Sequence, residues 1–356
     1  MKAFLILEDG TVFTGTSIGS TKSVISEIVF NTSMTGYLEV LTDPSYAGQA
    51  VVMTYPLIGN YGITPDMESK QPWSDGYIVR ELSRIPSNFR CQGTIQDFLK
   101  EHDIPGIAGI DTRALTKILR EKGTMNGMIT TDENYKLDEI LPQLHVYNTG
   151  NVVDKVTCSE KEVLKADGYK VALLDFGAKN NIAQSLHKRG CEVTIYPAHT
   201  TAEEILASNP DGIMLSNGPG DPKACTDIIK EVKKLYDSEV PIFAICLGHQ
   251  LMALATGADT YKLKYGHRGG NHPVKDLETG RVYISSQNHG YAVDAESLDP
   301  AVAVPAFTNV NDGTNEGLKY TGKNIFTVQF HPEACPGPQD SGYLFDKFIE
   351  MMGGQK

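Results

Sequence analysis

The segment Pro-Ile-Phe-Ala-Ile-Cys-Leu-Gly-His-Gln, residues 241 to 250, places a cysteine where a strand meets a helix. Residues 242–245 form an apolar run that is typical of a buried strand, and residues 250–255 are typical of a helix. The small residues Ala244 and Gly248 flank Cys246 and leave room for a tight turn. This pattern predicts a nucleophile elbow, with cysteine in the place where many hydrolases have serine.

Such a turn serves thiol chemistry. A thiol attacks as its thiolate, and both a helix N-terminus and a nearby imidazolium favour that form. The elbow also directs the backbone N–H of Leu247 toward a developing oxyanion, where one fixed donor is typically worth about 2.7–4 kcal/mol. We therefore interpret Cys246 as a nucleophile.

The candidate base is His331, in the segment His-Pro-Glu. Residues 325–330 are strongly β-like, so His331 is expected at the end of another strand. Pro332 restricts the chain so that Glu333 can reach back and orient the imidazole. The sequence predicts a Cys246, His331 and Glu333 triad.

Other histidines compete for this role. His289 lies in the polar segment Gln-Asn-His-Gly-Tyr, which could line a pocket, and is the better rival. His249 is interpreted as a packing or capping residue of the elbow helix. His267 and His272 lie in a glycine-rich stretch and resemble metal ligands, but no carboxylate or cysteine spacing supports a site. No metal is expected.

The loop Ser-Asn-Gly-Pro-Gly-Asp-Pro, residues 216 to 222, is a candidate for the second oxyanion donor. Glycines allow backbone amides to approach a ligand closely, so Gly218 or Gly220 could face Leu247. An ordinary strand-to-helix turn explains the same residues. No Gly-Lys-Ser/Thr follows, so the Walker pattern of nucleotide binding is absent.

Composition limits the possible classes of protein. The 356 residues include 32 basic and 44 acidic ones, and the net charge of −12 argues against a nucleic acid or an anionic membrane as partner. No apolar stretch approaches the roughly 18 residues that span a bilayer, and no signal peptide is recognised. The six cysteines lack paired spacing, so we expect reduced thiols and a cytoplasmic location.

Length and pattern predict two α/β domains, at residues 1–150 and 170–356, joined by a polar linker at 151–169. The first is mixed α and β, with a helix at 112–121 that Asp111 caps and Gly123 ends. Its expected strands are a hairpin within 4–13 and runs at 27–30 and 50–54.

The second domain alternates strands and helices. Strands are expected at 171–175, 192–196, 212–216 and 242–245, and helices at 180–190, 201–207 and 226–237. Such βα units predict an open, mostly parallel sheet, with ligands at the carboxyl ends of its strands. Cys246, His331 and the glycine-rich loop would all lie at that edge.

These motifs resemble a known family. The second half is similar to the class I, triad-type glutamine amidotransferases, and the whole chain resembles the small subunits of carbamoyl-phosphate synthetases. The resemblance is carried by these segments: Phe-Asn-Thr-Ser-Met-Thr-Gly-Tyr (30–37), Leu-Thr-Asp-Pro-Ser-Tyr (41–46), Gly-Ile-Asp-Thr-Arg-Ala-Leu-Thr (109–116), Cys-Leu-Gly-His-Gln (246–250), Gly-Gly-Asn-His-Pro-Val-Lys (269–275), Gln-Asn-His-Gly-Tyr (287–291) and His-Pro-Glu-Ala (331–334).

The resemblance implies that Cys246 attacks the side-chain amide of L-glutamine, that His331 moves protons and that Glu333 orients His331. It implies an oxyanion hole from Gly218 and Leu247. The implied glutamine-binding residues are Ser45, Gly218, Gly220, Leu247, Gln250, Asn288, Gly290 and Tyr291. Ser45 implies a contribution from the first domain, which is also expected to contact a partner.

The implied partner is a large subunit that uses MgATP and receives ammonia through an internal tunnel to make carbamoyl phosphate for arginine and pyrimidine synthesis. This chain is expected to bind no cofactor itself, and its complex to form a higher oligomer of heterodimers. A non-catalytic docking subunit and a free-standing thiol hydrolase of γ-glutamyl compounds are the alternatives. Two residues depart from the family pattern: Ala244 replaces a usual glycine, and Cys335 a frequent serine.

Overall fold

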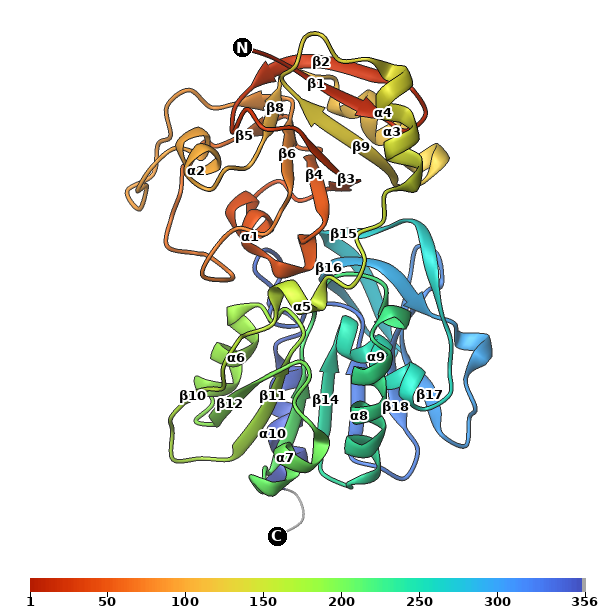
Figure 1. Cartoon of the computed structure of the whole chain (residues 1–356). Coiled ribbons are helices and arrows are strands. Elements are labelled where there is room, and N and C mark those ends of the chain that lie inside the picture. The colour runs from red at the N-terminus through yellow and green to blue at the C-terminus, as the bar shows by residue number, and fades with distance from the viewer. Residues whose placement is uncertain (354–356) are drawn as a thin grey trace. The chain divides into compact units, whose positions relative to one another are not determined.

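The computed structural model describes residues 1–353, which divide into two compact units, one of Met1–Gly150 and one that starts at Asn151 (Figure 1). Among these residues, no helix has both the length and the apolar character needed to cross a membrane. The cysteines of the described chain are all free thiols. Each unit has its own hydrophobic core.

Seven strands of the first unit close into a barrel in the order β1-β2-β8-β6-β4-β3-β9. They are β1 (Lys2–Leu7), β2 (Val12–Ser17), β3 (Val24–Asn31), β4 (Gln49–Met53), β6 (Gly76–Val79), β8 (Gly106–Ala108) and β9 (Met125–Thr130). The expected hairpin is confirmed, because β1 and β2 pair antiparallel and Leu7 N donates to Thr11 O at 2.9 Å. Gly10 makes this turn possible with φ 84°.

The remaining elements of this unit are α1 (Tyr37–Thr42), η1 (Pro44–Tyr46), α2 (Ile95–Glu101), α3 (Thr112–Lys122), α4 (Leu137–Val146) and the short pair β5 (Leu57–Ile58) and β7 (Glu81–Leu82). Helix α3 forms as expected. The Asp111 carboxylate accepts from Ala114 N at 2.9 Å, and Gly123 ends the helix with φ 102°.

The second unit contains a ten-stranded sheet in the order β10-β12-β11-β13-β14-β19-β18-β17-β15-β16. Its strands are β10 (Glu162–Leu164), β11 (Lys170–Asp175), β12 (Glu192–Pro197), β13 (Gly212–Leu215), β14 (Ile242–Ile245), β15 (Thr260–Asp276), β16 (Val282–Val293), β17 (Ala303–Asn309), β18 (Asn315–Tyr320) and β19 (Ile325–Val328). Strands β12, β11, β13, β14 and β19 are parallel neighbours.

Helices cover both faces of the parallel strands. The helical elements of this unit are α5 (Val153–Val156), α6 (Asn180–His187), α7 (Ala202–Ala207), η2 (Pro222–Ala224), α8 (Thr226–Asp237), α9 (Leu247–Ala255), η3 (Ala295–Ser297) and α10 (Tyr343–Gly353). Along β11, Ala172 and Leu174 pack into the core that includes α7, α8 and α9, whereas Val171 and Leu173 pack with α6 and α10. The period-two alternation of a strand thus builds two cores.

The polar stretch expected as a linker, residues 151–169, has structure of its own. It contains α5 and the edge strand β10, which pairs antiparallel with β12. Val152, Val153 and Val156 are buried, so one turn of helix suffices to anchor this polar segment. Strands β15 to β18 were not assigned from the sequence, and they extend the expected parallel sheet with an antiparallel half.

Candidate active site

Cys246 lies in a strained turn between β14 and α9. Its backbone has φ 52° and ψ −104°, a conformation that a residue with a Cβ rarely adopts. Such strain costs about 1–3 kcal/mol and persists where the surroundings fix it. Here Cys246 N donates to Val328 O at 2.8 Å. The side chain is 2% exposed. The predicted elbow geometry is present.

The small size of the residues that flank Cys246 is required by steric contacts. A Cβ on Gly248 would lie 2.6 Å from Leu215 O, so a larger residue would push α9 away from β13. Ala244 lies inside β14, buried, in regular register with Leu215 and Thr327. The extra methyl group that departs from the family pattern is therefore accommodated without a break in the sheet.

His331 reaches the same edge from the adjacent strand. Strands β14 and β19 run parallel with Ile245 opposite Val328, so the residues after each strand emerge side by side. His331 N then donates to Ser286 O at 2.9 Å, which ties the segment to β16. The imidazole is buried, with 1% exposure. Strand order thus brings together two residues that lie far apart in the sequence.

Glu333 holds the imidazole of His331, as expected. Its Oε1 lies 2.6 Å from His331 Nδ1, so Nδ1 carries the proton that this carboxylate accepts. Sequence reasoning missed the third member of this group. Lys179 Nζ donates to Glu333 Oε1 at 2.9 Å and to Ala334 O at 2.6 Å, and the lysine is 2% exposed. Its only sequence signal is its place just after β11, on the edge where ligands bind.

These buried charges shift one another's pKa values. Burial by itself would lower the pKa of His331, but Glu333 and Cys246 together outweigh burial and raise that pKa to about 10, while Lys179 opposes the rise. Burial by itself would raise the pKa of Glu333, but Lys179 and His331 hold it at about 2. At neutral pH, Glu333 is ionised and His331 readily holds a second proton.

This coupling predicts a pH dependence of stability. The imidazole of His331 has a pKa of 6.5 in the unfolded chain and of about 10 in the folded protein, so its protonation stabilises the fold. This stabilisation is complete below pH 6.5 and is lost as the pH rises toward about 10. We expect the difference in free energy of unfolding between the wild type and His331→Asn to be largest near pH 6 and to decrease toward pH 10. Urea unfolding at several pH values measures it.

The control for this series is His199→Asn, which removes a half-exposed imidazole that lies 2.6 Å from Asp154. The two histidines each contact one carboxylate at the same distance, and they differ in burial. A wild-type minus His331→Asn difference that stays constant from pH 6 to pH 10 would contradict the proposed charge coupling.

The thiol and the imidazole are neighbours without an ideal hydrogen bond. Cys246 contributes to the raised pKa of His331, yet His331 Nε2 has no hydrogen-bond partner of normal geometry among the described residues. The Sγ atom of Cys246 instead contacts Asn288 O, on β16, at 3.7 Å. Catalytic contacts are often loose without substrate and tighten when it binds.

The glycine-rich loop lies against the elbow. A Cβ on Gly218 would lie 2.3 Å from Phe176 O and 2.7 Å from Leu247 Cδ2, so only glycine allows this approach. Leu247 begins α9, where the first backbone N–H groups have no partner within the helix. Gly220 has φ 91°. The loop and the helix N-terminus therefore meet beside Cys246, as an oxyanion hole requires.

The other predicted glutamine-binding residues have varied surroundings. Gln250 donates through Nε2 to Tyr291 O at 2.8 Å and to Gln329 Oε1 at 3.0 Å, which links α9 to β16. Asn288 and Gly290 belong to the same strand, β16. Ser45 lies in the first unit, in η1, where its N–H donates to Asp43 Oδ1 at 2.9 Å.

The rival histidines have other partners. His249 is fully buried, its Nδ1 lies 2.7 Å from Thr327 Oγ1, and burial lowers its pKa to about 3, which confirms a packing role. His289 contacts Tyr291 O and Gln287 Oε1 of its own strand. Cys335, which departs from the family pattern, is half-buried, and both Ala334 and Cys335 have positive φ.

Comparison with known proteins places both units in one family. A family model for class-I glutamine amidotransferases matches residues 172–351, and one for the small-chain domain of carbamoyl-phosphate synthase matches residues 5–129. A carbamoyl phosphate synthase small chain from Clostridium perfringens is 53% identical over 351 residues, which cover 98% of this chain and 99% of the relative. The chain belongs to the carbamoyl-phosphate synthase small-chain family.

Further small chains agree with this assignment. One from Listeria monocytogenes is 52% identical over 357 residues, with 100% of this chain and 98% of the relative covered. One from Symbiobacterium thermophilum is 49% identical over 354 residues, with 97% of each chain covered. Because the matches extend over both units, the small-chain family accounts for the barrel as well as for the amidotransferase sheet.

Proposed function

We propose that this small chain hydrolyses L-glutamine and supplies the ammonia to a carbamoyl-phosphate synthase large subunit. The observation that carries the proposal is the buried contact of 2.6 Å between His331 and Glu333, at the end of the strand next to the Cys246 elbow. A docking subunit without catalysis has no need for a strained cysteine beside a buried, carboxylate-oriented imidazole.

The proposed reaction has two steps. Cys246 Sγ bonds to the amide carbon of glutamine after the thiol passes its proton to His331, and the carbon–nitrogen bond then breaks. The proton on His331 goes to the departing nitrogen, so ammonia leaves and a γ-glutamyl thioester remains. His331 next takes a proton from water, which attacks the thioester and releases glutamate with the free thiol.

Backbone amides are proposed to stabilise the oxyanion of both steps. Leu247 N–H at the start of α9 and Gly218 N–H in the adjoining loop are the donors. Glu333 keeps the imidazole in the tautomer that presents Nε2 to the thiol, and Lys179 keeps Glu333 ionised. Ser45, Gly220, Gln250, Asn288, Gly290 and Tyr291 are proposed to bind the amino acid part of glutamine.

The large subunit is proposed to bind MgATP and bicarbonate and to receive the ammonia through a tunnel. The product, carbamoyl phosphate, would serve arginine and pyrimidine synthesis in the cytoplasm, with the two subunits assembled as an oligomer of heterodimers. The small chain itself needs no nucleotide for these steps, because the thiol, the imidazole and the backbone donors complete the hydrolysis.

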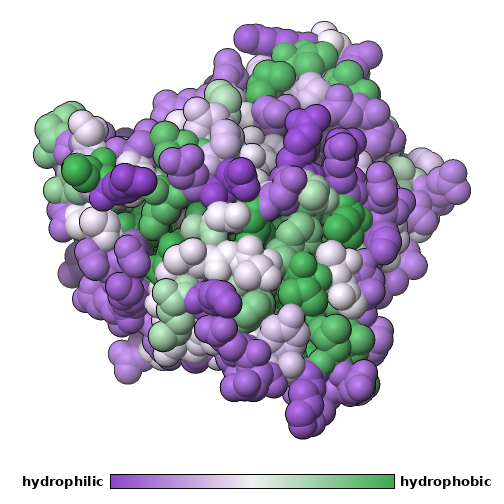
Figure 2. Space-filling model, turned by 90° about the horizontal axis from the view of Figure 1, so that it is seen from above, coloured by the Kyte–Doolittle hydropathy of each residue, from purple (hydrophilic) through white to green (hydrophobic). Residues whose placement is uncertain are grey.

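A contact with the large subunit is proposed for the first unit. Ile85 is 82% exposed and Phe89 is 97% exposed, in a segment outside the helices and strands. Figure 2 shows that apolar residues form several separate areas within a hydrophilic surface on the face in view. A fully exposed phenylalanine is unfavourable in water, and aromatic residues are frequent anchors of interfaces.

Phe89→Ser is expected to weaken the binding of the large subunit by about tenfold or more, since loss of an aromatic anchor costs about 2 kcal/mol. Titration calorimetry of the two subunits measures the change. The control is Val146→Ser, which alters another exposed apolar residue of the same unit, 80% exposed. If both variants bind like the wild type, Phe89 lies outside the interface.

The proposed function is tested by an assay of glutamate and carbamoyl phosphate with the small chain, its large subunit, glutamine, bicarbonate and MgATP. We expect both products in equal amounts. Glutamate without carbamoyl phosphate would keep the hydrolysis but assign the ammonia to another acceptor. The absence of both products, with a large subunit that is active on ammonia, would contradict the proposal.

A further inference from the structure

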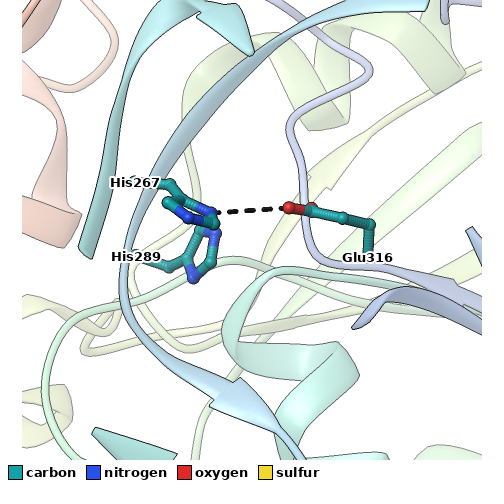
Figure 3. Close-up of side chains that lie close together, drawn as sticks. All are labelled: His267, His289 and Glu316. Carbon is teal, nitrogen blue, oxygen red and sulfur yellow. Dashed lines mark ion pairs between the residues drawn. The ribbon is translucent and has the colours of Figure 1, made fainter. Parts of the chain in front are cut away.

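A second buried cluster of ligand-type side chains lies in the antiparallel half of the sheet (Figure 3). His267 of β15 and His289 of β16 are direct partners in the strand register, and Glu316 extends toward them from β18. The three residues are 7%, 5% and 0% exposed, respectively. One ligand atom of each lies within 4.8 Å of those of the others.

The outer hydrogen bond of His267 defines which nitrogen faces the cluster. His267 Nε2 lies 2.8 Å from Asp312 Oδ2, and a carboxylate there accepts the N–H of the ring. Asp312 is itself held by Thr314, whose hydroxyl donates to Oδ1 at 2.7 Å. In the neutral ring, the form that binds a metal, the lone pair is then on His267 Nδ1, which is buried without a hydrogen-bond partner and lies 3.5 Å from Glu316 Oε1.

His289 is oriented in the same manner. Its Nδ1 lies 2.8 Å from Tyr291 O, and a carbonyl oxygen can only accept, so Nδ1 carries the hydrogen. The lone pair of the neutral ring is then on Nε2. That atom lies 3.0 Å from the amide oxygen of Gln287, which is another acceptor. The lone pairs of His289 Nε2 and Gln287 Oε1 therefore face each other, and a positive group between or beside them would stabilise this arrangement.

Glu316 supplies a buried carboxylate with one oxygen that accepts no hydrogen bond. Its Oε1 accepts from Asn309 Nδ2 at 2.9 Å, but its Oε2 is buried without a hydrogen-bond partner. A buried carboxylate oxygen without a partner is unfavourable, and a bound ion or an ordered water can satisfy such an atom. The carboxylate and the two imidazoles thus form one cluster, in which a ligand atom of each residue lies within 4.8 Å of those of the others.

We propose that His267 Nδ1, His289 Nε2 and the Glu316 carboxylate bind a divalent transition metal of the zinc type. Two imidazoles with one carboxylate suit zinc, whereas calcium and magnesium prefer oxygen ligands alone. The 3.5 Å between His267 Nδ1 and Glu316 Oε1 is about the spacing of two ligands in a tetrahedron with bonds of about 2.0–2.2 Å.

The surrounding contacts also fit a metal site. Metal-binding histidines commonly donate their other N–H to a carboxylate or a backbone carbonyl, as His267 does to Asp312 and His289 does to Tyr291. The ion would join β15, β16 and β18 next to Asn288, whose carbonyl contacts Cys246. Its role is to stabilise the wall of the active site, and it takes no part in glutamine hydrolysis. The proposal differs from the sequence-based expectation of no metal, which considered only spacing along the chain, whereas Glu316 comes from another strand.

The test measures zinc binding to the full-length chain with Cys246→Ser as background, so that the thiol and His331 cannot provide a competing site. After treatment with a chelator, equilibrium dialysis against Zn²⁺ and elemental analysis are expected to give one ion per chain. Co²⁺ in the same site is expected to give the visible absorption of a four-coordinate ion. Glu316→Gln in this background is expected to bind zinc at least about 100-fold more weakly.

Asp312→Asn provides a second test, since it leaves all three ligands in place and weakens only the support of His267, with an expected loss of affinity of about 10–100-fold. His199→Asn, which changes a surface histidine beside Asp154, is the control and should bind zinc like the background. Circular dichroism checks that each variant folds, and Asp312→Asn decides if Glu316→Gln does not fold. No bound zinc in the background would overturn the proposal in favour of a purely ion-paired network. Zinc binding by Glu316→Gln and Asp312→Asn with the affinity of the background would overturn it in favour of another site.

Discussion

Cys246→Ser is expected to lower glutamine-dependent carbamoyl phosphate synthesis by about 10³-fold or more, while ammonia-dependent synthesis by the assembled complex stays within about twofold of the wild type. A serine hydroxyl in the strained elbow is a much weaker nucleophile than a thiol, and His331 is arranged to serve a thiol. Ammonia added from solution needs neither group. The measurement is carbamoyl phosphate formation with saturating glutamine or ammonium chloride.

The control for this experiment is Cys335→Ser, which changes the second thiol close to the His-Pro-Glu segment. Cys335 is a half-buried thiol outside any disulfide. Like Cys246 it is a candidate for modification, but it follows the triad in the chain and lies outside the elbow. We expect it to retain most glutamine-dependent activity. An equal loss with both nitrogen donors in Cys246→Ser would argue against separate sites for hydrolysis and synthesis.

His331→Asn is expected to reduce glutamine hydrolysis by about 10²–10⁴-fold, the usual contribution of a general acid and base. Asparagine keeps a polar group at the end of β19 but cannot carry a proton from the thiol to the leaving ammonia. Initial rates of glutamate release measure the effect, and the loss should fall mainly on kcat, because the imidazole acts on the reacting atoms.

The matched control is again His199→Asn, whose imidazole also lies 2.6 Å from a carboxylate but on the surface. It should hydrolyse glutamine at the wild-type rate. A wild-type rate in His331→Asn would show that another group transfers the proton. His289, the alternative base considered in the sequence analysis, would then be the next histidine to replace.

The elbow and the parallel strands could be predicted because their signals are local. The apolar run before Cys246, its small neighbours and the amphipathic helix α8 each specify a structure within a few residues. The pairing of His331 with Glu333 was also within reach, since only Pro332 separates them. These features depend on short-range sterics and on periodicity, and both can be recognised in short segments of the sequence.

The antiparallel strands could not be predicted from the sequence, because their signals are not local. Strand β15 includes glycines, two histidines and Pro273, residues that are not typical of strands, and its pairing with β16 shifts register twice. Tertiary pairing overrides propensity there. The salt bridge of Lys179 with Glu333 joins distant parts of the chain, as does the approach of Glu316 to His267. No local pattern reports such contacts.

The most direct test of the central claim is to trap the covalent intermediate. The assembled complex is mixed with glutamine, quenched in acid during turnover and digested, and the peptides are analysed by mass spectrometry. We predict a γ-glutamyl thioester on the peptide that contains Cys246, and none on that peptide in Cys246→Ser. Continued glutamate release with the adduct on Cys335, or with an adduct that persists in Cys246→Ser, would contradict the assignment of Cys246 as the nucleophile.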